Sequence, residues 1–269
     1  MLFSIVTPSL NCGDFIRKNF ASIRQQGFGP EELEHWVIDG GSTDGTLDLL
    51  KCERNVKWIS EPDKGLSDAV NKGIQRARGD WILWVNADDF LADNALKVFL
   101  DYTRQYPDIR IFCGDQTVLR YDGSIEMTKP AWDYNLKELL GTRTSINQAS
   151  TFIHREAYDR VGLLDVSDRY TMDYEWLVRA MHFYKCVPIP QMLTYYRRRK
   201  NSITDAHTVK QFERFLELRR KYKQPCFSRA EFRVRFYLCT EPLRRIRPLR
   251  RFVRGIKELF GVAPPNPLP

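Results

Sequence analysis

The sequence predicts an α/β fold in which a mostly parallel central sheet is flanked by helices and followed by a helical C-terminal extension. Three observations support this prediction. Short apolar runs alternate with amphipathic segments over residues 1–115, polar turns follow the apolar runs, and helical patterns take over after residue 210. The 269 residues are 43% hydrophobic and 13% aromatic, which suffices for a large packed core and argues against disorder.

Apolar runs in the first half of the chain predict five strands. They span residues 3–8, 34–39, 56–60, 81–86 and 109–113. These runs have the length of strands, and polar turns follow them, as expected for a buried sheet.

Two segments between these strands have the apolar spacing of helices. The first follows Asp14, a suitable N-cap. Its apolar residues are Phe15, Ile16, Phe20 and Ile23. Those of the second helix are Leu66, Val70, Ile74 and Ala77. Because strands and helices alternate, we expect the strands to pair in parallel.

Beyond residue 115 the order of elements is less regular. A hairpin is predicted around residues 121–124, and helices are predicted at 135–140, 155–161 and 172–183. Two prolines, Pro188 and Pro190, predict a break in the chain before a strand that ends at Tyr196.

The cysteines and the apolar segments indicate the compartment. Six cysteines are scattered without a CxxC pair, which predicts free thiols in a reducing environment. The N-terminus lacks the pattern of a signal peptide, and no apolar run is long enough to span a bilayer. We therefore expect a cytoplasmic protein.

The net charge of +8 is concentrated near the C-terminus. Seven cations lie between residues 243 and 257 without an acidic residue, so the rest of the chain carries only +1. Beside them runs an apolar stripe of Leu243, Ile246, Leu249, Val253, Ile256 and Phe260. This pattern predicts a basic amphipathic segment at 241–260 that lies on an anionic membrane surface or packs against a partner chain. It argues against a nucleic-acid-binding module, which would spread its charge over a binding face.

The most informative stretch is the acidic pair Asp88 and Asp89, which follows the apolar run 81–85. Two carboxylates at the carboxyl end of a buried strand lie where open α/β sheets bind ligands. Carboxylate oxygens suit Mg²⁺ or Mn²⁺, which leave coordination positions free for substrate phosphates. Alternatively, the pair caps a helix that starts near Phe90.

Polar residues also follow the first three strands, at 7–11, 39–45 and 61–65, and we expect them to meet in one crevice. The glycines at 40 and 41 let the backbone approach a ligand closely, or they form a tight turn in which Ser42 caps the next helix. No Walker lysine motif and no GxGxxG motif is present, which disfavours a P-loop ATPase and a Rossmann dehydrogenase.

Four motifs in this order resemble those of glycosyltransferase family 2. They are SIVTPSLN at 4–11, VIDGGSTDGT at 37–46, SEPDKG at 60–65 and NADD at 86–89. The resemblance covers residues 3 to about 205. It implies a GT-A fold at 1–210, made of a Rossmann-like nucleotide-sugar-binding half (1–115) and an acceptor half (116–210), with the basic helical extension at 211–269.

The resemblance further implies a donor site for a nucleotide-diphospho-sugar. Its residues would be Thr7, Pro8, Asn11, Asp39, Asp63, Lys64, Asp88 and Arg199. Asp89 would be the direct ligand of Mn²⁺ or Mg²⁺, and Asp88 would face the ribose or the metal. Two positions depart from the family pattern: Asn86 replaces a common aspartate, and Arg199 replaces a histidine that completes the metal site in many relatives. Arg199 would instead bind the diphosphate, since a guanidinium suits phosphate oxygens.

Inverting transfer needs a base that deprotonates the acceptor hydroxyl. By resemblance this is Asp173, although an acid at a helix start can simply stabilise the helix dipole. Glu175 lies roughly 200° further around the same helix, so both carboxylates cannot reach one acceptor atom. Glu175 is therefore assigned to acceptor binding or to the support of a neighbouring site residue. Gln148 is assigned to acceptor binding, with contacts to the donor sugar as the alternative.

The predicted function is that of an inverting, metal-dependent hexosyltransferase. It would move a sugar, with a UDP-sugar expected as donor, onto a hydroxyl of a glycan or lipid-linked saccharide in surface polysaccharide synthesis, on the inner face of the plasma membrane. The alternative enzyme is a metal-dependent sugar nucleotidyltransferase. The chain lacks the glycine-rich, lysine-containing phosphate loop that such an enzyme normally carries.

Overall fold

The computed structural model describes residues 1–141, 145–199, 207–222 and 229–240. A nine-stranded sheet forms its centre, in the order β3-β2-β1-β4-β8-β6-β9-β5, with β7 paired to β6. The strands are β1 (Phe3–Ser9), β2 (Leu33–Asp39), β3 (Lys57–Ser60), β4 (Trp81–Trp84), β5 (Phe90–Leu91), β6 (Ile111–Leu119), β7 (Ile125–Lys129), β8 (Thr151–His154) and β9 (Cys186–Arg197). The helices are α1 (Gly13–Arg24), α2 (Thr46–Cys52), α3 (Leu66–Arg76), α4 (Ala95–Gln105), α5 (Leu136–Gly141), α6 (Arg155–Val161), α7 (Met172–Ala180), α9 (Thr208–Lys221) and α10 (Arg229–Thr240), with a 3₁₀ turn at Gln148–Ser150.

The first half is the predicted parallel βαβ unit. Strand β1 pairs in parallel with β2 along its whole length, from Phe3 to Ser9. Its pairing with β4 is also parallel but ends at Val6. Beyond Val6 the sheet therefore opens between β1 and β4 at their carboxyl ends, the position at which open α/β sheets bind ligands.

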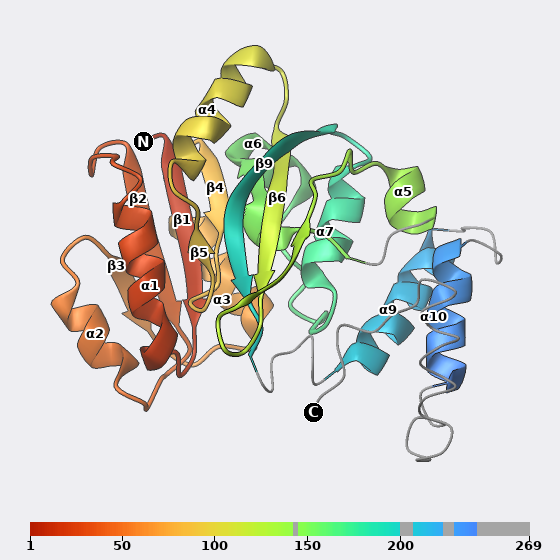
Figure 1. Cartoon of the computed structure of the whole chain (residues 1–269), viewed down its shortest axis with the longest axis horizontal. Helices are drawn as coiled ribbons and strands as arrows, with labels where there is room; N and C mark the ends of the chain where they lie inside the picture. Colours follow the sequence, from red (N-terminus) through yellow and green to blue (C-terminus); the bar gives the residue numbers. More distant parts are fainter. Residues whose placement is uncertain (142–144, 200–206, 223–228, 241–269) are drawn as a thin grey trace.

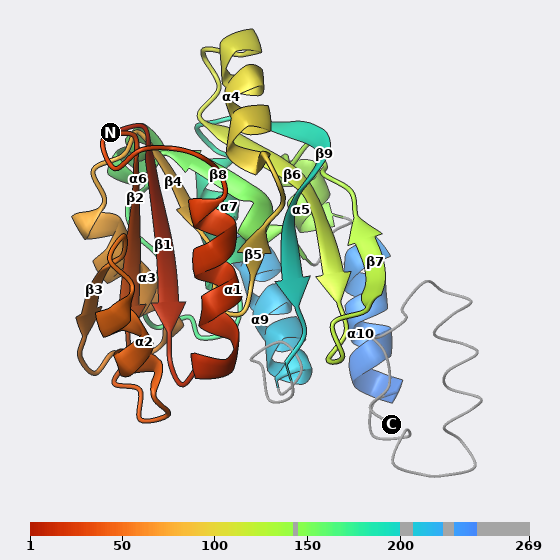
Figure 2. The same cartoon turned by 60° about the vertical axis from the view of Figure 1, so that its left-hand side comes forward.

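The second half is mixed rather than parallel. Strand β8 runs antiparallel to both β4 and β6 and so joins the two halves. Strand β6 pairs in parallel with β9, while β7 and β5 add antiparallel edges. Figure 1 shows α2 at one end of the molecule and α9 and α10 at the other. The turned view in Figure 2 shows the edge strand β7 beside β6.

The predicted break at Pro188 and Pro190 is wrong, because both prolines lie inside the continuous strand β9. The register against β6 shifts between Gly114 and Asp115, whose partners are Ile189 and Met192. Pro190 therefore falls in a bulge, where its missing N–H breaks no ladder hydrogen bond.

Three predicted helix caps are also wrong. The segment after the acidic pair is strand β5, and the next helix starts at Ala95, so neither aspartate caps it. Helix α1 starts at Gly13 after Cys12, which leaves Asp14 in the first turn. Helix α2 starts at Thr46, after the left-handed Gly45, and Ser42 lies outside it.

The C-terminal helices share a core with the second half of the sheet-containing domain, residues 116–210. Phe215 and Leu218 of α9 and Val234 of α10 belong to the same buried cluster as Trp176 and Leu177 of α7. The domain boundary predicted at 210 lies next to the start of α9 at Thr208, and it stays a prediction. The amphipathic segment predicted at 241–260 lies outside the described residues. Within the part of the chain that the structure describes, no helix has both the length and the hydropathy of a membrane span.

Close packing of α3 on β1 leads to a stability prediction. A Cβ added to Gly73 would lie 2.2 Å from Cγ1 of the fully buried Val6. We expect Gly73→Ala to lower the free energy of unfolding by about 1–3 kcal/mol, because overpacking forces the two elements apart. Gly141→Ala is the matched control, since nothing lies within 4 Å of its added Cβ. Equal denaturation midpoints for the two variants would contradict this packing.

Candidate active site

Asp39, at the carboxyl end of β2, organises the loop 40–45. Its Oδ2 accepts hydrogen bonds from the backbone N–H groups of Gly41 (3.0 Å) and Ser42 (2.9 Å) and from the Ser60 hydroxyl (2.7 Å). The Ser42 hydroxyl donates to Oδ1. Asp39 is fully buried, and its observed contacts hold the loop in place. The role of Asp39 in the donor site stays a prediction.

Asn11 joins the end of β1 to the same loop. It adopts a left-handed conformation with φ of 51°, its backbone N–H donates to Ser42 Oγ (2.7 Å), and its Oδ1 accepts from Thr43 N (2.9 Å). Thr7 and Pro8 precede it in β1 and are buried. Thr7 Oγ1 lies 2.9 Å from Nε2 of His35, whose pKa burial lowers to about 3, so this imidazole is neutral at physiological pH.

Asp63 lies against the first glycine of this loop. A Cβ built on Gly40 would be 2.5 Å from Asp63 Oδ2, and Asp63 Oδ1 accepts from Gly65 N at 2.8 Å. The neighbouring Lys64 is exposed. The structure thus brings Asn11, Asp39 and Asp63 together around one loop, as the sequence predicts.

The two adjacent carboxylates differ in their surroundings. Asp89 is fully buried: Oδ1 accepts from Arg197 N (2.9 Å) and Oδ2 from Asn86 Nδ2 (3.0 Å). Burial, together with the nearby Asp88, raises the pKa of Asp89 well above its usual range. The Asp88 side chain is 19% exposed. Asp88 is therefore the more accessible of the two carboxylates, and the metal-ligand role expected for Asp89 stays a prediction.

Arg199 lies beside Asp88. Its Nε is 3.5 Å from Asp88 Oδ2, its Nη1 is 3.0 Å from Cys12 Sγ, and its guanidinium lies 5.2 Å from the ring centroid of Phe15. The antiparallel pairing of β5 with β9 brings the end of β9 to the acidic loop. Arg199 thus connects the acidic loop with the end of β1.

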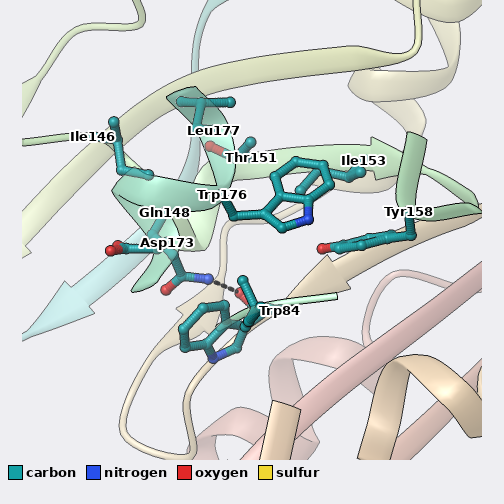
Figure 3. A pocket seen from close by; sticks show the side chains of 10 residues that line it. Trp84, Ile146, Gln148, Thr151, Ile153, Tyr158, Asp173, Trp176 and Leu177 are labelled. Atoms are coloured by element: carbon teal, nitrogen blue, oxygen red, sulfur yellow. Dashed lines mark hydrogen bonds between the residues drawn. The ribbon is translucent and has the colours of Figure 1, made fainter. Parts of the chain in front are cut away.

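Asp173 lies in a small pocket at the start of α7. The pocket, of about 30 Å³, is lined mainly by aromatic and aliphatic side chains (Figure 3). Its lining residues are Trp84, Ile146, Gln148, Thr151, Ile153, Tyr158, Leu164, Asp173, Trp176 and Leu177. Burial raises the pKa of Asp173 to about 6, although its Oδ1 accepts from Tyr174 N at 2.8 Å. A carboxyl group with this pKa can accept a proton near neutral pH.

The two residues assigned to the acceptor occupy different places. Gln148 lines the pocket with Asp173, and its Nε2 donates to the carbonyl of Trp84 at 2.7 Å (Figure 3). Glu175 is buried and paired with Arg179, with Nε to Oε2 at 3.0 Å. It does not line this pocket, so its contacts give the acceptor role no support.

Sequence reasoning missed the aromatic walls of the pocket. Trp84, Tyr158 and Trp176 come from β4, α6 and α7, and each fits an apolar pattern that simply indicates a core residue. Trp84 alone carried a signal, because it lies two residues before the acidic motif.

The sequence profile of Glycosyl transferase family 2 matches residues 4–162, more than half of the chain. The chain belongs to this family. A PGL/p-HBAD biosynthesis glycosyltransferase of Mycobacterium bovis is 30% identical to this family 2 chain over 207 residues, covering 72% of the chain and 73% of the relative. Chondroitin synthase of Escherichia coli is 34% identical over 116 residues, which is 42% of the chain and 16% of that protein.

Solved structures show that this family 2 member has the GT-A fold. S. aureus TarS 1–349, in complex with UDP-GlcNAc, has a TM-score of 0.64 at 17% identity. The match covers 80% of this chain and 65% of that one. The mannosyltransferase PcManGT from Pyrobaculum calidifontis, in complex with GDP-Man and Mn²⁺, has a TM-score of 0.60 at 18% identity. This match covers 80% of this chain and 64% of PcManGT. The predicted fold class and family are confirmed.

The contact between Gly40 and Asp63 predicts a selective effect on donor binding. In Gly40→Ala the added Cβ would displace the Asp63 carboxylate. We expect affinity for the nucleotide-sugar to fall by about 3- to 10-fold, the effect of one lost hydrogen bond. Stability should change little, because the end of a partly exposed side chain can move. Calorimetric titration measures the affinity, with Gly29→Ala, whose Cβ would meet only Glu32 at 3.9 Å, as control. Unchanged donor affinity in Gly40→Ala would exclude Asp63 from the donor site.

Proposed function

We propose that the protein is an inverting glycosyltransferase that moves a sugar from a nucleotide-diphospho-sugar to a hydroxyl of a glycan or lipid-linked acceptor. The observation that carries this proposal is Asp173, a carboxyl with a pKa of about 6 in an aromatic-walled pocket. Trp84 forms part of that pocket and directly precedes the loop that carries Asp88. The candidate base and the candidate diphosphate site therefore flank one short segment.

In the proposed reaction Asp173 accepts the proton of the acceptor hydroxyl as its oxygen attacks the anomeric carbon of the donor sugar. The bond from that carbon to the diphosphate breaks, and the nucleoside diphosphate leaves with the bonding electron pair. Attack opposite to the leaving group inverts the anomeric configuration. Gln148, which lines the same pocket, would position the acceptor.

The donor is assigned to the carboxyl ends of β1 and β4, where the pairing of these two strands ends. The structures of TarS with UDP-GlcNAc and of PcManGT with GDP-Man support a nucleotide-diphospho-sugar as the donor class. We propose a UDP-sugar, held by the loop around Asp39 and by Asn11, with Thr7, Pro8, Asp63 and Lys64 also at the site. Arg199 would bind the diphosphate, because its guanidinium already lies at the acidic loop.

The residues at the acidic loop fit a divalent cation that shares its coordination with the substrate. Among the described residues no group of three potential His, Cys, Asp or Glu ligands gathers in one place. Mg²⁺ commonly binds through one or two carboxylates plus substrate phosphates, and Asp88 offers such a carboxylate. Asp89 is fully buried whereas the Asp88 side chain is 19% exposed, so we propose Asp88 as the ligand in place of Asp89. When bound, Mg²⁺ or Mn²⁺ would stabilise the charge of the departing diphosphate.

The proposal is tested by isothermal titration with UDP- and GDP-sugars, with and without Mn²⁺, followed by product analysis. We expect binding of one donor class, release of the nucleoside diphosphate on transfer, and an inverted anomeric configuration by NMR. Release of pyrophosphate would favour a nucleotidyltransferase. Absence of binding to every nucleotide-sugar would overturn the proposal.

The proposed membrane role of the segment 241–260 needs a separate test. Removing residues 241–269 should release the protein from vesicles of anionic lipid while leaving nucleotide-sugar binding unchanged. Equal vesicle binding by the full and the shortened chain would refute it.

A further inference from the structure

We propose that Asn86 is a positioning residue that holds the acceptor pocket and the diphosphate end of the donor site in one arrangement. The inference rests on the proposed function for the identity of these two sites. It concerns the first position of the acidic motif, where this chain has an amide instead of a carboxylate.

The Asn86 side chain uses both of its polar atoms. Oδ1 accepts a hydrogen bond from Trp84 Nε1 at 2.8 Å, and Nδ2 donates to Asp89 Oδ2 at 3.0 Å. The indole N–H can only donate, and in the structure both carboxyl oxygens of Asp89 act as acceptors. A residue between them must therefore accept on one side and donate on the other, which an amide does and a carboxylate does not.

Each partner of Asn86 leads to one of the two sites. Trp84 lines the pocket of Asp173, and its carbonyl accepts from Gln148. Asp89 accepts from the backbone N–H of Arg197, two residues before Arg199. Through Asn86, the indole at the acceptor side and the end of β9 at the donor side belong to one hydrogen-bonded chain.

The backbone of the acidic loop is held independently of the Asn86 side chain. Asn19 Nδ2, from α1, donates to the carbonyl oxygens of Asn86 (3.1 Å) and Asp89 (3.0 Å). A substitution at 86 should therefore leave the loop in place while it releases Trp84 or Asp89.

An exchange of two residues tests the bonding pattern. In Asn86→Asp the new carboxylate can still accept from Trp84, but a hydrogen bond to Asp89 then requires the two carboxyl groups to take up and share a proton. In Asp89→Asn two amides lie between two fixed donors, the indole N–H of Trp84 and the backbone N–H of Arg197. Whichever way the amide of Asn86 is turned, one N–H group then faces another N–H group. In the double variant N86D/D89N the pattern is restored, since the amide at 89 donates to the carboxylate at 86 and still accepts from Arg197.

We expect each single variant to lower kcat/KM for the acceptor by about tenfold or more, the cost of an unpaired buried group. The acceptor KM should rise and the dissociation constant of the donor should increase, because both sites lose their alignment. In the double variant, kcat/KM for the acceptor should recover to within about threefold of the wild-type value. A difference of this size is expected when two neighbouring substitutions compensate each other almost completely. Asn86→Ala, which removes both bonds, should not be rescued by Asp89→Asn.

Two outcomes would overturn the proposal. One is an N86D variant as active as the wild type or more so, which would indicate that a carboxylate is preferred here. The other is a double variant no better than the single ones. Thermal unfolding of the wild type, N86D, D89N and the double variant, measured without substrate, gives the same double-mutant cycle for stability. If melting temperatures recover in the double variant but KM and donor affinity never changed, Asn86 is merely structural and the proposal fails.

The same measurements separate this inference from the proposed function. The recovery of the melting temperature in the double variant requires no donor or acceptor. A wild-type protein that binds no nucleotide-sugar would refute the proposed function, while the melting temperatures would still report the hydrogen-bond exchange.

Discussion

Replacing Asp173 with asparagine is expected to lower the rate of sugar transfer by about two to four orders of magnitude, the contribution of a general base. The amide keeps the shape of the side chain but cannot accept the acceptor proton. Nucleotide-sugar affinity should stay close to that of the wild type, because Asp173 lines the pocket proposed for the acceptor and not the loop around Asp39. Single-turnover kinetics and calorimetric titration measure the two quantities separately.

The matched control is Asp159→Asn, an exposed aspartate on the neighbouring helix α6, which should transfer sugar at the wild-type rate. If Asp173→Asn loses donor affinity instead of turnover, Asp173 belongs to the donor site. If its turnover is unchanged, Asp173 is an ordinary acid in the first turn of α7.

The raised pKa of Asp173 also predicts a pH dependence. As a base the carboxyl must be ionised, so kcat/KM should rise as the pH increases through about 6 and then level off. The folded pKa lies above the ordinary value of 3.8, so ionisation of Asp173 destabilises the fold. This destabilisation is full above pH 6 and disappears as the pH falls to about 3.8. Asp173→Asn should therefore unfold at a higher temperature than the wild type at pH 8, and this difference should shrink towards pH 4.

Replacing Asp88 with asparagine should remove most of the gain in donor affinity that Mn²⁺ provides. Asp88 offers the accessible carboxylate of the acidic loop, and an amide is a weaker ligand for a hard cation. We expect the affinity measured with Mn²⁺ to fall by more than about tenfold, since even the loss of an outer-shell partner has that effect. Titration of UDP and a UDP-sugar with Mn²⁺ and with a chelator measures the gain.

Arg199→Ala provides the complementary comparison, because Arg199 pairs with Asp88 but carries positive charge itself. It should reduce the donor affinity that remains in the presence of a chelator. A Mn²⁺ response that persists in Asp88→Asn but disappears in Asp89→Asn would return the ligand role to Asp89.

Much of the donor half could be predicted from the sequence. The strands that end at Ser9, Asp39 and Ser60 and the helix over Leu66–Arg76 follow from apolar runs and helical spacing. Such signals are local, since neighbouring residues determine periodicity and turns. The alternation of strands and helices also predicts the parallel pairing of β1, β2, β3 and β4, which places the loops after β1, β2 and β3 at one edge.

The acceptor half could be predicted less well. The prolines of β9 indicated a break, yet the bulge against β6 accommodates Pro190. Glu175 was predicted to bind the acceptor because it lies two residues after Asp173. In the structure it forms an ion pair with Arg179, one helical turn later. The pair Glu175–Arg179 has the local i,i+4 spacing of a helical ion pair and could have been predicted. The bulge that accommodates Pro190 depends on the register against β6, which is distant in the sequence.

The sequence by itself determined the family, the parallel first half of the sheet and the segments that carry the polar residues, because these depend on patterns within a few residues. Only the tertiary structure decided which carboxylate of the acidic pair is accessible, what Asn86 bridges and where Arg199 lies. Asp89 meets the backbone of Arg197 across 108 positions of the chain, and Arg199 meets Cys12 across 187. The physical reason is that hydrogen bonds and burial between such distant residues exist only after the sheet has brought them together.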